Sequence, residues 1–354
     1  MADIGLRLPV NYYYNASSDI PKLGEVVLMY PEYSDTSIPL VGNGANQISD
    51  LLEITKRKST TIVIGTPPYS GNNVDVICSG YQDTGVINSA IDALPANGGK
   101  IILLDGIYSI AGSIIINKKN VTIEGMGNST IIYADRRVKD YEIFVIEGGN
   151  NCTIRNIKID APECVGILAG GYYSDSGYNN FHNCTFDCGA GIILEGAYSG
   201  NCYNRIYNNT FLFTSKEAND SWEWGVGIGI SGNYGGASNN HIYNNIFLNT
   251  VNVNLNYFYS SISIEGGVDF GTPSGNHITG NRFISYHHGP YTFALNIDYN
   301  STNKTVITHN DFSVFQKYLT YDRVNESQWY GTIDTVESIY SNYNSICGLN
   351  ITGS

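Results

Sequence analysis

The segment N-R-I-Y-N-N-T-F at 204–211 decides the fold of this chain, because it returns along the sequence. Close copies are N-H-I-Y-N-N-I-F at 240–247 and N-H-I-T-G-N-R-F at 276–283. Weaker copies are V-I-T-H-N-D-F at 306–312, N-F-H-N-C-T-F at 180–186 and T-I-R-N-I-K-I at 153–159. The apolar residues that close these copies are separated by 27, 25, 36, 36 and 29 residues. Repeats of this length are typical of solenoids, in which each repeat packs on its neighbours.

The repeats are built from short strands. From residue 107 onward, apolar-alternating runs such as S-I-I-I-N and N-V-T-I-E-G-M-G are separated by Gly and Asn. This pattern predicts an all-β fold, a right-handed, single-stranded parallel β-helix over residues 113–354, with inward Ile, Val, Leu and Phe stacked in layers. One position of the repeat is asparagine in four of the copies, which predicts an asparagine ladder at a corner. Its members are Asn209, Asn245, Asn281 and Asn310.

Residues 59–112 are predicted to form the entry cap of this solenoid. Residues 60–64 are rich in β-branched side chains and favour a strand. Apolar residues recur at helical spacing over 86–94, and Gln82-Asp83-Thr84-Gly85 can cap that helix. Such a cap would shield the first open coil of the solenoid from solvent.

Part of the chain resembles a known fold family. The stretch D-T-G-V-I-N-S-A-I-D-A-L-P-A-N-G-G-K-I-I-L-L-D-G-I-Y at 83–108, with N-V-T-I-E-G-M-G at 120–127, is similar to the start of pectate-lyase-like right-handed β-helix proteins. The resemblance covers about residues 75–350. It implies the fold and an N-terminal capping helix, but no activity, because lyases, hydrolases, epimerases and non-catalytic adhesins share this fold.

Residues 1–58 contain no solenoid repeat and are predicted to form a small β module. The segments G-E-V-V-L-M-Y-P-E at 24–32 and P-L-V-G-N-G-A-N-Q-I-S-D-L at 39–51, with Asp35-Thr36 between them, resemble the N-terminal module of phage tail fibres and phage hyaluronidases. Gly42-Asn43-Gly44 stands where that family usually has Gly-Asp-Gly. The resemblance implies a virion-attached, homotrimeric protein bound to other tail or baseplate proteins. The family's catalytic residues lie outside the matched segments, so none is carried over.

The composition excludes several classes of partner. Charged residues make up 14% of the chain and the formal net charge is −13. That charge argues against binding nucleic acid or an anionic membrane surface. A neutral surface rich in Gly, Asn, Ser, Thr and Tyr suits sugars better. No apolar run is long enough for a membrane-spanning helix, and the start of the chain has no leader pattern, so we expect synthesis in the host cytoplasm.

A second repeated pattern, apolar–x–apolar–acid–Gly, gives the main catalytic hypothesis. It occurs as F-V-I-E-G, I-I-L-E-G, I-S-I-E-G and L-N-I-D-Y. Strand alternation would place its fourth position outside the solenoid, in one column. The column would contain Glu147, Gly170, Glu195, Ser231, Glu265 and Asp298.

The spacing of this column suits glycoside chemistry. Adjacent coils lie about 4.8 Å apart, so Glu265 and Asp298 would be separated by about 5 Å, and Glu195 and Glu265 by about 10 Å. Retaining glycosidases need carboxylates about 5–5.5 Å apart and inverting enzymes about 6.5–9.5 Å. Asp269 could join the site. The alternative interpretation is a solvated strand edge or a binding surface without catalysis.

Two further groups of residues are candidates for contacts. The aromatic residues near the acids could stack on sugar rings. They are Trp222, Trp224, Tyr198, Tyr257 and Tyr259. The residues that follow the closing phenylalanines, Leu212, Leu248 and Ile284, would form an apolar stripe, which is either a trimer interface or covered by long loops.

The histidines and cysteines suggest structure rather than metal chemistry. His241 and His277 occupy the same repeat position and are predicted to stack. The seven cysteines lack paired zinc-ligand spacing, so we expect buried thiols and neither a metal nor another cofactor.

These observations lead to three functional hypotheses. The first is a tail spike or tail fibre of a phage, or of a prophage-like particle, that binds host cell-surface polysaccharide without cleaving it. The second is a spike that also depolymerises the glycan, as a hydrolase or lyase. The third is a free bacterial carbohydrate-active enzyme. The first two place the protein on the virion tail.

Overall fold

The computed structural model describes two compact units, Met1–Ser59 and Thr60–Ser354. In the first unit, strands β1 (Val26–Met29) and β2 (Ile38–Val41) pair antiparallel, as expected for the strand predicted at 26–30. In the second unit, the structure describes residues 60–69, 74–135, 141–170, 176–196, 202–213, 224–231, 236–250, 258–265, 273–285, 292–298, 305–315 and 349–352. The rest of the predicted module at 1–58 lies outside the described residues.

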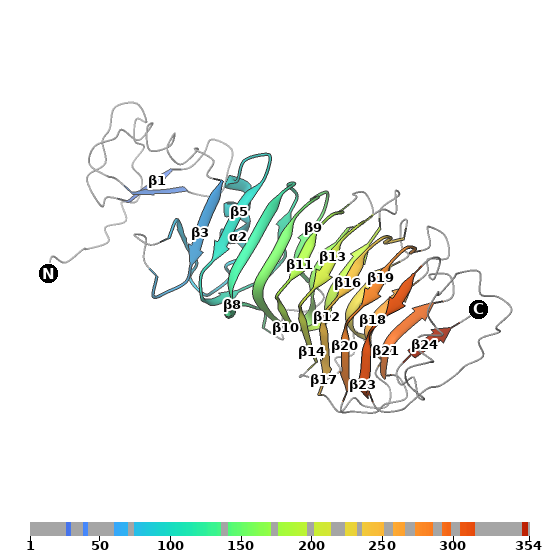
Figure 1. Ribbon diagram of the computed structural model, residues 1–354. Helices are drawn as coiled ribbons and strands as arrows, with labels where there is room; N and C mark the ends of the chain where they lie inside the picture. Colours follow the sequence, from blue (N-terminus) through green and yellow to red (C-terminus); the bar gives the residue numbers. More distant parts are fainter. Residues whose placement is uncertain are drawn as a thin grey trace. The chain divides into compact units, whose positions relative to one another are not determined.

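The second unit is a parallel β-helix, which confirms the predicted fold class (Figure 1). Its coils contribute strands to three parallel sheets. The first sheet contains β3 (Thr61–Gly65), β5 (Gly99–Leu103), β11 (Asn180–His182), β13 (Arg205–Tyr207), β16 (His241–Tyr243), β19 (His277–Thr279) and β22 (Val306–Thr308). The second contains β6 (Gly106–Ser109), β14 (Thr210–Phe213), β17 (Ile246–Asn249), β20 (Arg282–Ser285) and β23 (Asp311–Phe315).

The third sheet contains β7 (Ile114–Ile116), β9 (Glu142–Ile146), β15 (Trp224–Ser231), β18 (Phe258–Glu265), β21 (Thr292–Asp298) and β24 (Leu349–Thr352). Three long strands turn corners and belong to more than one sheet: β8 (Val121–Tyr133), β10 (Thr153–Ala169) and β12 (Thr185–Glu195). The short β4 (Val76–Ile77) pairs with β3. None of the helices among the described residues is long and apolar enough to cross a membrane.

Helix α2 (Thr84–Ala93) covers the first coil, as predicted for the cap. Ile87, Ala90 and Ile91 of this helix are buried in the common core. The Asn88 side chain accepts a hydrogen bond from the Ile115 backbone N–H at 2.9 Å and donates one to the Ser113 carbonyl at 3.0 Å. The helix therefore satisfies the edge of the third sheet beside β7.

The N-terminus of helix α2 differs in one detail from the prediction. Asp83 is the N-cap residue, but its side chain makes no capping hydrogen bond. Its buried carboxylate accepts hydrogen bonds from the backbone N–H groups of Ser79, Gly80 and Ser109 at 2.9, 3.2 and 3.0 Å. Asp83 therefore ties the entry loop to β6, a long-range contact that local sequence does not reveal. At the other end of the helix, Lys118 Nζ donates to the terminal carbonyls of Ile91, Asp92 and Leu94.

Asparagine ladders line both corners beside the first sheet. The predicted ladder is confirmed, with Asn245 Nδ2 donating to Asn281 Oδ1 and Asn281 Nδ2 to Asn310 Oδ1, both at 3.0 Å. A second ladder, not predicted as such, precedes the first sheet. The side-chain oxygen of each member accepts a hydrogen bond from the backbone N–H of the residue at the same position of the preceding coil. The members are Asn179, Asn204, Asn240 and Asn276. The ladders pair buried backbone groups that a turning chain would leave unsatisfied.

A phenylalanine stack fills the core between the second and third sheets. The rings of Phe186, Phe211, Phe247 and Phe283 stack with centroids 4.8, 4.8 and 5.0 Å apart. Glycines of the third sheet make room for these rings. A Cβ atom on Gly191 would lie 2.6 Å from the ring of Phe211, and one on Gly227 would lie 2.8 Å from Phe247. The repeat thus places its largest side chain opposite its smallest.

Candidate functional site

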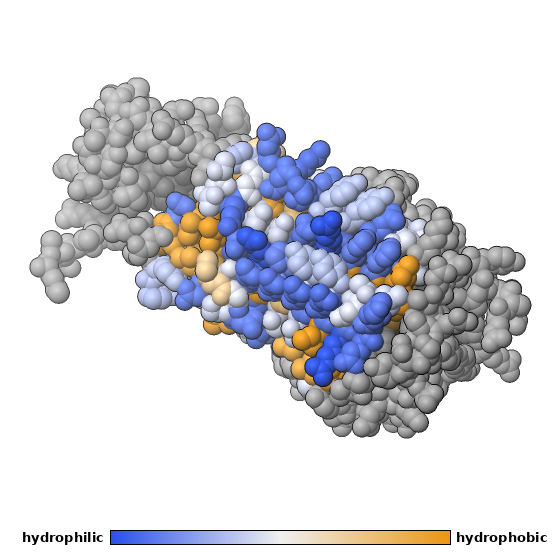
Figure 2. Space-filling view, viewed as in Figure 1, coloured by the Kyte–Doolittle hydropathy of each residue, from blue (hydrophilic) through white to orange (hydrophobic). Residues whose placement is uncertain are grey.

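The outer face of the first sheet carries polar and aromatic side chains in register. Each short strand buries its central residue, such as Ile206 or Ile242, and turns its two flanking residues outward. Figure 2, in the view of Figure 1, shows a largely hydrophilic surface over these strands. We define the first-sheet face by these outward residues and by the corner residues that precede them. They are Tyr178, Asn180, His182, Tyr203, Arg205, Tyr207, Asn239, His241, Tyr243, His277 and Thr279.

One column of this face is a ring stack. The rings of His182 and Tyr207 lie 4.6 Å apart, and those of Tyr207 and Tyr243 lie 4.9 Å apart, all nearly parallel. Thr279 and Thr308 continue the column, with their hydroxyls 3.2 Å apart. Burial lowers the pKa of His182, and the nearby charge of Arg155 lowers it further. The stack therefore presents ring edges and hydroxyl groups at regular intervals along the helix axis.

A pair of tyrosines borders the face at its first corner. Tyr178 and Tyr203 are 60% and 41% exposed, and their rings stack at a centroid distance of 5.2 Å. Both adopt positive φ angles, 59° and 50°, where the equivalent residues of other coils are asparagine or glycine. A bulky residue in this conformation costs about 1 kcal/mol or more. Strain of this kind together with exposed aromatic rings is typical of a binding surface.

The coils that precede this face in the first sheet carry a compensated charge cluster. Glu124 forms ion pairs with Lys100 and, at 2.9 Å, with Arg155. Burial opposes ionisation of Glu124, but hydrogen bonds from Lys100 and Arg155 leave its pKa below the usual value. Further along the sheet, Arg205, His241 and His277 are exposed in one column.

Sequence reasoning identified the His241–His277 stack but did not assign a function to this face. The two rings do stack, with centroids 4.8 Å apart. The sequence does contain a signal for these outward positions, which is the alternation inside the repeat. Arg-Ile-Tyr, His-Ile-Tyr and His-Ile-Thr each bury the isoleucine and turn the other two residues outward. This alternation predicts which side chains point outward, but it does not indicate which outward column binds a ligand.

The predicted acid column has the expected register. Ala169 pairs with Leu194, and Glu195 pairs with Ser231, which in turn pairs with Glu265. Ile264 pairs with Ile297, so Asp298 follows Glu265 on the next coil. Of the acids proposed for catalysis, Glu195 is the one whose side chain is described; it is half-buried. Burial, and secondarily the charge of Glu142, raises its pKa. The side chains of Glu265 and Asp298 and all of Asp269 lie outside the described residues.

The predicted aromatic ligand contacts need one correction. Tyr259 is 1% exposed, packs edge-on against Phe213 at 4.4 Å and lies 3.2 Å from Ser261 through its hydroxyl, so it does not stack on a sugar. The physical reason is a change in the strand alternation. Gly227 and Ser261 are skipped in the pairing of β15 with β18, and Tyr259 is buried in the same core as Ile262 and Ile264. Trp222, Tyr198 and Tyr257 lie outside the described residues, as does the side chain of Trp224.

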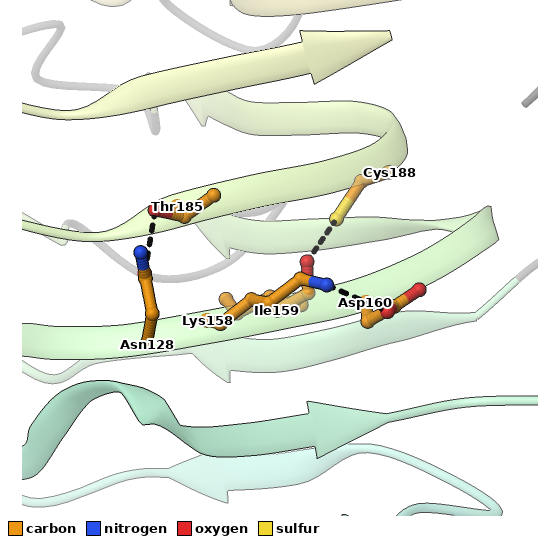
Figure 3. Close-up of polar contacts among 6 residues, drawn as sticks. All are labelled: Asn128, Lys158, Ile159, Asp160, Thr185 and Cys188. Carbon is orange, nitrogen blue, oxygen red and sulfur yellow. Dashed lines mark hydrogen bonds and ion pairs between the residues drawn. The ribbon is translucent and has the colours of Figure 1, made fainter. Parts of the chain in front are cut away.

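The apolar stripe on the second sheet is in register. Leu212 pairs with Leu248 and Leu248 with Ile284, and all three are partly exposed. The preceding coils carry polar residues at the same face, and Asp187 pairs with Leu212. Figure 3 shows the contacts there: Lys158 and Asp160 form an ion pair at 2.9 Å, and Asn128 and Thr185 a hydrogen bond at 2.8 Å. The stripe therefore borders a polar surface on the preceding coils, and its role as a trimer interface stays a prediction.

The described cysteines are buried thiols, as predicted. Burial raises the pKa of Cys184 to about 12 and that of Cys152 to about 11, which keeps both protonated. No group of three or more His, Cys, Asp or Glu residues within the described ranges could hold a metal ion. Cys347 lies outside those ranges.

No protein-family model matches the chain, and no curated protein matches it. Among solved structures, it is similar to ORF18 of Geobacillus virus E2, with 14% identity, 81% of this chain and 65% of that chain covered, and a TM-score of 0.32. It is also similar to the tailspike protein of E. coli bacteriophage HK620, solved with a pentasaccharide, with 13% identity, coverage of 80% and 60%, and a TM-score of 0.39.

A pectin methylesterase mutant solved with a hexasaccharide is a third similar structure, with 12% identity, coverage of 75% and 93%, and a TM-score of 0.40. The chain thus spans 65% and 60% of the two viral chains named above. Likeness at this level concerns the fold and does not extend the ligands of those proteins to this chain.

Proposed function

We propose that this protein binds host cell-surface polysaccharide, as the receptor-binding part of a tail spike or tail fibre of a phage or prophage-like particle. The observation that carries the proposal is the first-sheet face. Its hydroxyl, amide and imidazole groups repeat along the helix axis at the spacing of the coils, with 4.6 and 4.9 Å between stacked rings. A repeating row of hydrogen-bonding groups is complementary to a repeating polymer of hydroxylated sugars.

The exposed aromatic pair strengthens this proposal. Tyr178 and Tyr203 lie at the border of the row, with rings accessible to solvent. Aromatic rings combine an apolar body with a polar hydroxyl, which suits the apolar face and the hydroxyl rim of a pyranose. The low fraction of charged residues, 14%, fits the same class of ligand.

Attachment to a particle rests on other features. The sequence similarity of residues 24–51 to tail-fibre modules supports binding of that unit to tail or baseplate proteins. The stripe of Leu212, Leu248 and Ile284 supports a homotrimer, because a partly exposed apolar column of this kind is typical of an interface. We therefore assign the protein to the virion tail.

The test is binding of the full chain to host cells and to a panel of purified surface polysaccharides. We expect saturable binding that falls about tenfold in Tyr203→Ala, in line with the loss of one stacking contact and its hydrogen bond. Tyr133→Ala is the matched control, because Tyr133 is 37% exposed but lies on the second sheet. Equal loss in both variants, or no binding to any host glycan, would contradict the proposal.

A second candidate function is cleavage of the bound glycan. The observation that favours it is Glu195, whose raised pKa suits a general acid, in register with Glu265 two coils further along. We expect Glu195→Gln to abolish release of oligosaccharides while binding persists. Glu147→Gln, at the exposed end of the same column, should retain activity. Assays for reducing ends and for unsaturated products separate hydrolase from lyase, and absence of both products from every bound glycan ends this candidate.

A further inference from the structure

We propose that the column formed by Arg205, His241 and His277 binds the carboxylates of an acidic polysaccharide, with an affinity that rises as the two imidazoles become protonated. This inference rests on the proposed function, because it names the chemical class of glycan that the first-sheet face would take. It goes beyond that function by assigning a charge to the ligand and a pH dependence to its binding.

The geometry places three cationic or titratable groups side by side. Arg205 pairs in register with His241, and His241 with His277, on β13, β16 and β19. All three residues are exposed. The two imidazoles stack with centroids 4.8 Å apart and an interplanar angle of 19°. An anionic polymer that runs along the helix axis would meet one such group on each of three successive coils.

The column has no carboxylate beside it within the described part of the chain. Asn180 precedes Arg205 in the column and Val306 follows His277. The adjacent outward column contributes Tyr207, Tyr243 and Thr279. Glu124, on a preceding coil of the same sheet, already pairs with Lys100 and Arg155. Arg205 makes no ion pair with a described residue, although most arginines and lysines of the sheets do.

The residues at the bordering corner are also uncharged. They are Tyr203, Asn239 and Gly275 on one side and Asn208, Asn244 and Gly280 on the other. Burial, then the charges of His277 and Arg205, lowers the pKa of His241. No described carboxylate offsets this effect, and a bound anion would favour protonated His241 by supplying an opposite charge.

The positive charge of this column is unusual in an acidic chain. The protein has a formal net charge of −13, which would repel an acidic glycan unless a local positive site offset it. A guanidinium followed by two imidazoles supplies such a site, since hydrogen bonds to charged carboxylates are about twice as strong as neutral ones. A neutral stacking role alone would not require, in the same column, an arginine that has no ion pair with a described residue.

The experiment measures binding of the full chain to three acidic polysaccharides, polygalacturonate, hyaluronate and polysialic acid, with neutral dextran as the uncharged comparison. We expect at least one acidic polymer to bind at about pH 5.5 and to bind about tenfold more weakly at about pH 8. Arg205→Gln and the double variant His241→Gln/His277→Gln should each lose about tenfold in affinity at the lower pH. Lys119→Gln, which removes an exposed charge elsewhere, should change nothing.

A measurement on the unaltered protein makes the test independent of how the variants fold. Calorimetric titration at about pH 6.5 in buffers of different ionisation enthalpy reports the protons taken up on binding. We expect net proton uptake, because the bound carboxylates stabilise protonated His241 and His277. Binding of acidic polymers without proton uptake, or with full affinity in the Arg205 and histidine variants, overturns the inference.

The outcomes also separate this inference from the proposed function. Binding of dextran or a neutral host glycan, without binding of any acidic polymer, would leave polysaccharide binding in place and overturn the assignment of an acidic ligand. If no acidic or neutral polysaccharide binds, host surface glycans included, then both the proposed function and this inference are wrong. Equal binding of acidic polymers and duplex DNA would show a general affinity for polyanions and would contradict a carboxylate site on a glycan.

Discussion

An inward and an outward column of this β-helix have the same geometry and opposite chemistry. Inside, the phenylalanines from Phe186 to Phe283 stack at 4.8–5.0 Å between ring centroids. Outside, His241 and His277 stack at 4.8 Å above Arg205. The coil spacing sets both distances, because paired strands lie about 4.8 Å apart whatever their side chains are.

The difference lies in what each column gains from stacking. Phenylalanine rings gain dispersion contacts and lose contact with water, so identical neighbours stabilise one another. A guanidinium beside two imidazoles gains little from stacking, and it meets like charges when the imidazoles are protonated. Repetition therefore stabilises the fold inside the solenoid, whereas the outward column is the surface for which we propose an anionic partner.

The largest expected effect on stability concerns the phenylalanine stack inside the β-helix. Replacing Phe247 by alanine removes a fully buried ring between two others and leaves a cavity against Gly227. We expect the free energy of unfolding to fall by about 3–5 kcal/mol, measured from chemical denaturation. Phe247→Leu should cost less, because it keeps most of the buried volume. A loss below about 1 kcal/mol in the alanine variant would contradict the role given to the phenylalanine stack.

The next effect compares neighbouring asparagines with opposite exposure. Asn245 is buried, donates to the Ile206 carbonyl at 2.9 Å and to Asn281 Oδ1 at 3.0 Å, and accepts from the Asn209 backbone N–H at 3.0 Å. We expect Asn245→Ala to cost about 2–3 kcal/mol, because it leaves buried groups unpaired. The adjacent Asn244 is exposed with φ of 55°, so Asn244→Gly should be nearly neutral or stabilising. Equal effects in both variants would contradict the ladder's role in satisfying the backbone.

A smaller effect on stability is expected for the residue after the phenylalanine. Leu248 is partly exposed on the outer surface of the strand that buries Phe247. Leu248→Ser should cost about 1 kcal/mol within one chain, since little apolar surface is lost. If the stripe is a trimer interface, the same variant should shift the mass in solution from trimer towards monomer, measured by light scattering. A monomeric unaltered protein at micromolar concentration would refute that interface.

The smallest effect concerns the outward histidines and pH. The folded state lowers the pKa of His241 below that of the unfolded chain, so the unfolded state binds more protons between the two values. The free energy of unfolding should therefore fall as the pH drops through about 6.5 and be unaffected above about pH 7.5. His241→Gln should remove this part of the slope. An unchanged pH profile in the variant would contradict the sign of the shift.

Much of the fold could be predicted from the sequence because the repeat encodes it locally. The spacing of the closing apolar residues predicted the register of Ile159, Phe186, Phe211, Phe247 and Phe283, and the paired strands have that register. Glu195, Ser231 and Glu265 likewise form the predicted column. Contacts made once, outside the repeat, were not predictable in this way. The carboxylate of Asp83 turns away from its helix to bind Ser109, and Tyr259 points inward where the strand alternation changes.

The sequence by itself determined that this chain winds into a parallel β-helix with layered side chains, because a periodic pattern of buried residues can be read without knowing their neighbours. Only the tertiary structure decided which outward columns stand alone and which are compensated. Glu124 is matched by Lys100 and Arg155 from the coils on either side, whereas no described carboxylate lies beside Arg205. Charge compensation depends on distance in space, and residues from different coils come together only when the chain has folded.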